Sequence, residues 1–180
     1  MWAALIKRYW QVSIFKKTPD QTPYSWFLLI IIALFYYALV MMQWTIAEVE
    51  QASPLRGGLL VGVLFILSYA LYTFALLFVF RVASRLVQTL SCLYAGHAVV
   101  HVFALPMLLL SPWLISANML EPMMRFVSII YLIATLMLTV WQFMVSVHIY
   151  KHALGVDYLA AVLASIGLLA SNILTISFWR

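Results

Sequence analysis

Charged residues are scarce in this chain. Asp, Glu, Lys and Arg together make up 8% of its 180 residues, whereas a soluble domain carries about 25%. A large soluble core does not account for so great a deficit. Hydrophobic residues make up 67% of the chain, and lipid is the solvent that tolerates such a composition. The sequence therefore indicates an integral membrane protein.

Cysteine pairs and catalytic motifs are also missing. The single cysteine, Cys92, can form no intramolecular disulfide and no paired-cysteine zinc or redox site. The chain contains no P-loop, HExxH or GxSxG pattern, and no paired carboxylates. Its apolar runs contain no Asp, Glu, Lys or Arg of the kind that proton-coupled transporters usually need. These absences disfavour a pump, a classical transporter or a hydrolase, and we expect no enzyme activity and no cofactor.

Five apolar runs are long enough to cross a bilayer, which takes roughly 20 residues each. We place them at about 26–46, 59–80, 86–110, 123–147 and 158–178, with loops at 111–122 and 148–157. The connecting segments are too short for a soluble catalytic domain. The sequence thus predicts an all-α bundle of five transmembrane helices over residues 26–180.

Residues 1–25 form a separate cytoplasmic segment in this interpretation. Trp2, Leu5, Ile6, Tyr9 and Ser13 follow helical spacing, which predicts an amphipathic helix lying on the membrane surface over about 1–17. The prolines at positions 19 and 23 then end any helix. A frayed tail with scattered aromatic residues is the alternative. The first apolar run begins too late for a cleavable signal peptide.

Orientation follows from the Lys and Arg residues in the short loops. One side of the predicted bundle receives Lys7, Arg8, Lys16, Lys17, Arg81, Arg85 and Lys151. The other side receives Arg56, Arg125 and Arg180. This asymmetry predicts a cytoplasmic N-terminus and a periplasmic C-terminus. The first seven are also the candidates for contact with lipid headgroups or partners, and because they sit at helix ends we expect no nucleic acid partner.

The four histidines form two i,i+4 pairs, His97 with His101 and His148 with His152. Residues four apart share a helix face, so His97 and His101 could hold a metal or line a proton path inside the bilayer. The alternative is that these histidines form hydrogen bonds to neighbouring helices or line a small hydrated pocket. His148 and His152 fall at the cytoplasmic end of the fourth run, so a single four-histidine site is not expected, and neither is haem.

The third run is the most polar of the five. Its Gln88, Ser91, Cys92, Ala95 and Gly96 form a stripe of small and polar residues, which is typical of close helix packing in membranes. Gln142 in the fourth run and Asn172 in the fifth are the expected partners of this stripe. Pro106 is expected to kink the helix.

Three segments resemble an uncharacterised group of proteobacterial inner-membrane proteins: residues 22–29 (TPYSWFLL), 85–90 (RLVQTL) and 141–154 (WQFMVSVHIYKHAL). The layout is similar to that of the Yip1-type five-span proteins. This resemblance implies a membrane-organising protein without catalytic residues, and no functional residue carries over from it. We therefore expect a non-enzymatic inner-membrane protein that binds lipids, other membrane proteins or itself. The rival is a small channel, carrier or redox subunit using His97 and His101.

Overall fold

The computed structural model describes residues 2–47, 54–116 and 121–177. Over these ranges the chain is helical and contains no strand. Its α-helices are α1 (Trp2–Ser13), α2 (Trp26–Ala47), α3 (Pro54–Val79), α4 (Leu86–Ser116), α5 (Pro122–Leu154) and α6 (Tyr158–Ser177), with short 3-10 turns η1 (Pro19–Gln21) and η2 (Ala83–Arg85). The predicted all-α class is confirmed, and α2 to α6 are the five helices long and apolar enough to cross a membrane. Arg180 lies outside the described residues.

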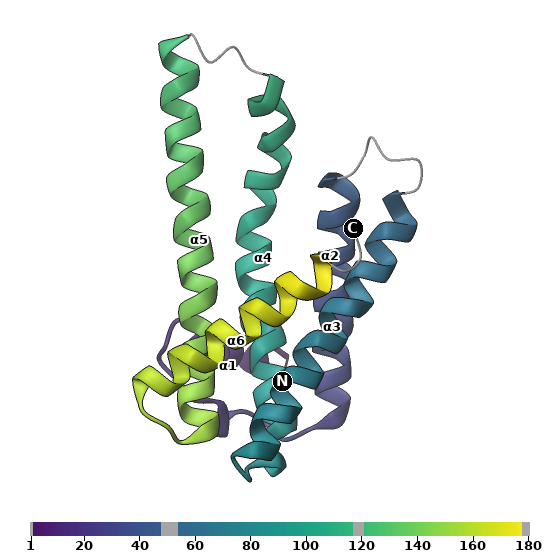
Figure 1. Cartoon of the computed structure of the whole chain (residues 1–180), viewed down its shortest axis with the longest axis vertical. Coiled ribbons are helices and arrows are strands. Elements are labelled where there is room, and N and C mark those ends of the chain that lie inside the picture. Colours follow the sequence, from purple (N-terminus) through teal and green to yellow (C-terminus); the bar gives the residue numbers. More distant parts are fainter. Residues whose placement is uncertain (1, 48–53, 117–120, 178–180) are drawn as a thin grey trace.

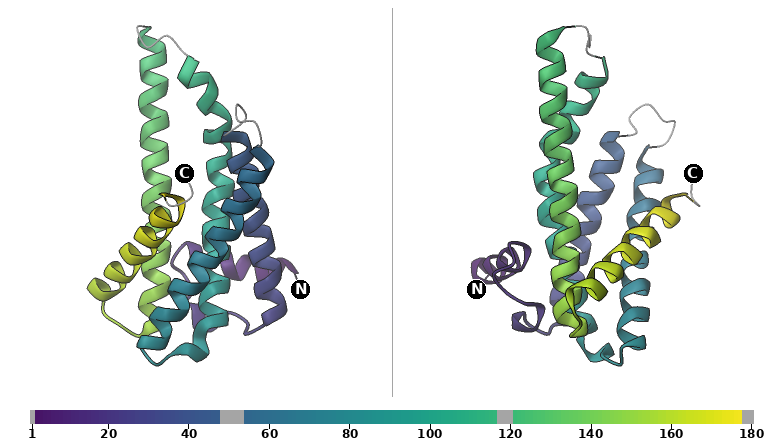
Figure 2. Two further views of the ribbon diagram at one scale, coloured as in Figure 1. Left: turned by 45° about the vertical axis from the view of Figure 1, so that its right-hand side comes forward. Right: turned by 60° about the vertical axis from the view of Figure 1, so that its left-hand side comes forward.

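Helices α2 to α5 run along the long axis of the molecule, while α6 crosses them obliquely (Figure 1). α2 packs against α3 and α4, α4 packs against α5, and α6 contacts α5 and α3. α1 lies across the lower part of the bundle and contacts α4 and α5 (Figure 2). α4 and α5 form a hairpin that reaches beyond the ends of α2 and α3 (Figure 1).

Burial is concentrated in one half of this hairpin. Between Val87 and Val100 most side chains of α4 are buried, and so are most between Val145 and Leu154 of α5. In the other half of α5, residues 122–140 include no buried side chain. Large apolar side chains such as Phe126 (64% exposed) cover it. A surface of this kind suits lipid or another membrane helix as its neighbour.

Three helix ends differ from the sequence prediction. α4 passes through Pro112 to Ser116 instead of ending at 110. Pro112 has no N–H for the carbonyl of Leu108, and the Ser111 hydroxyl donates to that carbonyl instead, at 2.7 Å. α5 extends to Leu154, where Gly155 in the left-handed conformation (φ 68°) ends it. α3 begins at Pro54 instead of at about 59, because proline is suited to the first position of a helix.

The connections alternate between the two ends of the bundle (Figure 1). The segment after α1, the α3–α4 connection and the α5–α6 turn lie at one end, which we name the basic end because it carries Lys16, Lys17, Arg81, Arg85 and Lys151. Arg56 and Arg125 belong to the first turns of α3 and α5 at the opposite end. The fold thus separates the cations as the sequence predicts.

Candidate functional site

His97 is buried in the middle of α4, where its ring forms hydrogen bonds with side chains from two other helices, α3 and α5. The Tyr69 hydroxyl lies 2.6 Å and the Gln142 amide nitrogen 3.0 Å from Nδ1. An amide nitrogen only donates, so Nδ1 is the acceptor. Nε2 then carries the proton and donates to the Ser146 hydroxyl at 2.8 Å. Both ring nitrogens therefore have hydrogen-bond partners. This arrangement is the one expected if His97 bonds to neighbouring helices and does not bind a metal.

His101, one turn further along α4, is held by Gln43 of α2. The Gln43 amide nitrogen donates to the backbone carbonyl of His101 at 2.9 Å, and the Gln43 amide oxygen lies 2.5 Å from the ring Nδ1. Because a carbonyl only accepts, the amide nitrogen must face it and the amide oxygen must face Nδ1. Nδ1 therefore donates, and in the neutral ring Nε2 keeps a free lone pair.

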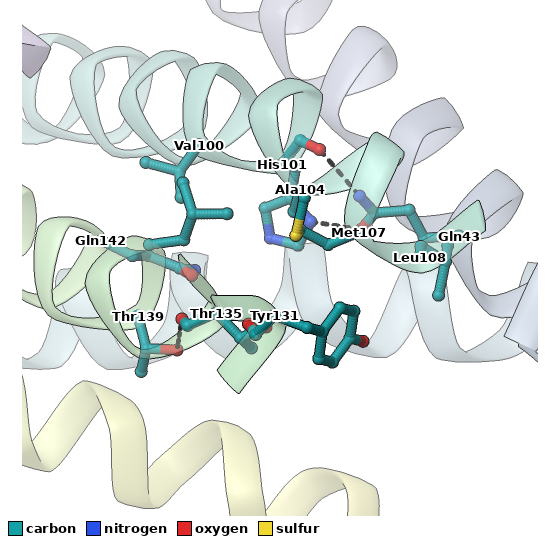
Figure 3. A pocket seen from close by; sticks show the side chains of 11 residues that line it. Gln43, Val100, His101, Ala104, Met107, Leu108, Tyr131, Thr135, Thr139 and Gln142 are labelled. Atoms are coloured by element: carbon teal, nitrogen blue, oxygen red, sulfur yellow. Dashed lines mark hydrogen bonds between the residues drawn. The ribbon is translucent and has the colours of Figure 1, made fainter. Parts of the chain in front are cut away.

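A cavity of about 230 Å³ lies between α4 and α5 beside His101. We name it the polar cavity. Figure 3 shows His101 of α4 on one side of it and the α5 side chains Gln142, Thr139, Thr135 and Tyr131 on the other. Its polar lining consists of Gln43, His101, Tyr131, Thr135, Thr139 and Gln142. No Asp, Glu, Lys or Arg takes part in that lining.

Tyrosine rings surround both histidines. Tyr36 stacks on Tyr94 with ring centroids 5.7 Å apart. Tyr36 and His101 make an edge-to-face contact with ring centroids 5.4 Å apart. Tyr69 and His97 make a second one, with centroids 5.1 Å apart. The sequence analysis missed these tyrosines and Gln43. Only Gln43 gave a signal, because it is a polar residue inside an apolar run.

The polar stripe of α4 meets a different partner from the predicted one. Gln88 donates to the backbone carbonyl of Thr22 at 2.9 Å, and Cys92 lies 3.5 Å from the hydroxyl of the same threonine. Gln142 instead contacts His97, and Asn172 accepts from Ser68 of α3 at 3.0 Å. The expected pairing of the stripe with Gln142 and Asn172 is wrong. The small side chains of α4 make room for the N-terminal segment.

Three of the residues expected at the membrane surface have structural partners, and one of them, Arg8, donates to the backbone carbonyl of Gln21 at 3.4 Å. Arg85 donates to the backbone carbonyls of His152 and Ala153 at the end of α5, at 3.2 and 2.9 Å. A cation there also stabilises the negative end of the helix dipole. His148 contacts the carbonyl of Lys17 at 2.8 Å, which ties the N-terminal segment to α5. Exposed side chains belong to Lys7, Arg8, Lys16, Arg81 and Lys151.

The two histidine pairs lie closer together along the bundle than the sequence predicts. His97 contacts Ser146 of α5, which lies only two residues before His148. The sequence analysis expected a greater difference in depth because it ended the fourth helix too early. The described residues contain no group of three or more His, Cys, Asp and Glu that could hold a metal ion. The metal at His97 and His101 stays a prediction.

A second opening separates α1 from α2 and α4. We name it the α1 groove; its volume is about 470 Å³ and its surface is almost entirely apolar. Trp2, Ile6 and Trp10 of α1 form one wall, and residues such as Phe35 and Val102 form the other. Burial raises the pKa of Tyr9 above its ordinary value, so this lining phenol stays neutral. The sequence analysis did not predict a groove.

Comparison with known proteins leaves the site to be judged on its geometry. No family model matches the chain, and no curated protein or solved structure matches it. The resemblance to the Yip1-type layout stays a prediction. The polar cavity, the α1 groove and the basic end are thus the three features on which a functional proposal can rest.

Proposed function

We propose that this chain is a non-enzymatic, multi-pass protein of a bacterial inner membrane and that it binds an anionic phospholipid in the α1 groove. The observation that carries the proposal is the groove itself. It lies between an amphipathic helix and two of the five long apolar helices, and the amphipathic helix carries the exposed basic residues Lys7 and Arg8. The Lys and Arg asymmetry supports a cytoplasmic location for the basic end and a periplasmic one for the far end.

The groove has the size and surface that a lipid chain requires. Its volume of about 470 Å³ falls within the roughly 300–1,000 Å³ of ordinary ligand sites. Trp2 and Ile6 are 53% and 69% exposed on its α1 wall. An acyl chain lying in the groove would cover these side chains and would bury almost no polar surface of the protein.

The charges favour an anionic headgroup. Lys7 and Arg8 are exposed on α1, and Lys16 and Lys17 follow that helix. Each such cation near an anionic membrane surface contributes about 1 kcal/mol. An amphipathic helix with these features binds in the headgroup region with its apolar side toward the acyl chains. The groove and these cations would then bind the two parts of one lipid.

A membrane-protein partner or a second copy of the chain is the competing occupant. The exposed half of α5, residues 122–140, offers such a partner an apolar helix face. Its polar side chains there, such as Thr135 and Thr139, line the polar cavity, whereas the α1 groove is almost entirely apolar and suits a lipid chain. The rival of a channel, carrier or redox subunit has less support, since both nitrogens of His97 are hydrogen-bonded.

The test uses two variants that place the same bulky side chain at equally exposed positions. Val102 in the groove is 43% exposed and Val63 of α3, outside the groove, is 46% exposed. Each is replaced by tryptophan, and the full chain is reconstituted in nanodiscs of mixed phosphatidylglycerol and phosphatidylcholine. Native mass spectrometry after release then counts the retained lipids.

We expect the unaltered protein and Val63→Trp to retain phosphatidylglycerol, and Val102→Trp to lose it. Lys7→Gln and Arg8→Gln should each lower the preference for phosphatidylglycerol over phosphatidylcholine roughly fivefold. Equal retention by Val102→Trp and Val63→Trp would contradict the proposal. So would a stoichiometric protein partner in place of lipid.

A further inference from the structure

We propose that the polar cavity between α4 and α5 binds the neutral phenolic head group of an apolar molecule, with His101 Nε2 accepting the hydrogen bond from its hydroxyl. This site is separate from the α1 groove. The inference goes beyond lipid binding at the basic end and does not depend on it.

Three of the polar groups that line the cavity can act as hydrogen-bond acceptors for a guest. Gln43 holds the His101 ring with its Nδ1 proton turned away, so the lone pair of Nε2 is left for the cavity (Figure 3). Thr135 donates its hydroxyl proton to the carbonyl of Tyr131 at 2.8 Å, and Thr139 donates to the carbonyl of Thr135 at 2.9 Å. Each threonine oxygen can then only accept from a guest. A guest that satisfies this set must donate.

The same lining excludes a charged guest. The cavity contains no carboxylate and no cationic side chain, so an ion would lie at membrane depth without a counter-charge. Such burial costs several kcal/mol. A neutral donor avoids that cost, and hydroxyl is the smallest common one.

Size and shape favour an aromatic head on a longer apolar molecule. A volume of about 230 Å³ is below the roughly 300–1,000 Å³ of a site that encloses a whole ligand. The ring of Tyr131 and the thioether of Met107 line it, and both make favourable contacts with aromatic rings. Thr135 and Thr139 are exposed, so the cavity opens on the outer face of the hairpin. An apolar tail could leave there past exposed leucines such as Leu136 (61% exposed).

A matched set of ligands tests the proposal on the unaltered protein. The probes are para-octylphenol, para-octylanisole, in which a methyl group replaces the hydroxyl proton, and decanol, which keeps a hydroxyl without a ring. Binding to the full chain in mild detergent is followed by the nitrogen NMR signals of a histidine-labelled sample. The signal of His101 Nε2 should start at the value of an unprotonated imidazole nitrogen and move when octylphenol binds.

We expect octylphenol to bind about fivefold or more tightly than octylanisole, which corresponds to the loss of one hydrogen bond. Thr139→Val, which removes one acceptor and leaves the Gln43–His101 pair intact, should weaken octylphenol binding and leave octylanisole binding unchanged. Equal affinities for octylphenol and octylanisole would overturn the proposal. Decanol binding as tightly as octylphenol would overturn it too, as would a protonated Nε2 in the free protein.

Discussion

Gly96 marks a close approach of α4 to α5, and its replacement by alanine tests that packing. A Cβ atom added at Gly96 would lie 2.7 Å from Cγ1 of Val145. The next nearest atoms, in Ser13 and Ile149, would be 3.6 and 3.9 Å away, which is ordinary contact. Val145 is fully buried (0% exposed) and β-branched, so its side chain cannot turn aside freely.

Two effects of opposite sign act on Gly96→Ala. Alanine in place of glycine within a helix stabilises it by about 1 kcal/mol. Forcing a methyl group into a packed contact costs about 1–3 kcal/mol. In the unaltered chain we expect the change to be neutral or destabilising by up to about 2 kcal/mol.

The sign should reverse when Val145 is replaced by alanine, because the clashing Cγ1 atom is then gone. In the Val145→Ala background, Gly96→Ala should stabilise the protein by about 1 kcal/mol. The two changes are thus expected to be coupled by about 1–3 kcal/mol. Val147→Ala provides the matched control, since Val147 is equally buried (1% exposed) but is not among the atoms nearest Gly96.

The chain carries its own probe for this measurement. Cys92 is the only cysteine and is buried (0% exposed) one turn before Gly96. Its reaction with a thiol-reactive fluorescent dye therefore reports loss of packing around α4 during heating in detergent. Stabilisation of the unaltered chain by Gly96→Ala would refute the close approach. The same effect of Gly96→Ala in the Val145→Ala and Val147→Ala backgrounds would refute it as well.

Three further predictions concern the basic end, the N-terminal helix and the topology. Arg85→Gln should destabilise the protein by about 1 kcal/mol, because the last carbonyls of α5 lose their charged donor. Arg81→Gln, at an exposed cation without such bonds, should not, and Cys92 labelling measures both. Trp141→Phe removes the bond from Nε1 to the Ser13 carbonyl (2.9 Å), so hydrogen exchange in α1 should become faster, and unchanged exchange would contradict that role. An alkaline phosphatase fused after Arg180 should be active, whereas activity of a cytoplasmic reporter there would overturn the proposed orientation.

Local sequence was enough to identify the helices and their order. Each long helix coincides with an apolar run, because a membrane-length helix is encoded by the hydropathy of its own residues. Alternation of the runs also placed the cations at opposite ends. The helix ends were less predictable. Pro112 predicts the end of a helix. The helix continues because the Ser111 hydroxyl bonds to the Leu108 carbonyl that Pro112 leaves without an N–H donor.

Contacts between helices required the tertiary structure. Gln43 and His101 are 58 positions apart, and no periodicity within α2 or α4 relates them. The contact between His97 and Ser146 could not be predicted either. The rotation and tilt of α4 against α5 decide which polar groups face each other. These rotations also determine that His97 is fully hydrogen-bonded while His101 leaves one nitrogen for a cavity.

For the N-terminal helix, too, the sequence predicts the helix itself but not its contacts. Its spacing of apolar residues predicted an amphipathic helix, and α1 is a helix from Trp2 to Ser13. That it packs on α4 and α5 and leaves a groove beside α2 follows from contacts between residues far apart in the chain, such as Trp10 with Phe103 of α4 and Ser13 with Trp141 of α5. The sequence by itself therefore determined five apolar helices, their order and the sidedness of their charges, because these depend on neighbouring residues. Only the tertiary structure decided where the α1 groove and the polar cavity lie, because both are spaces between helices that no single segment encodes.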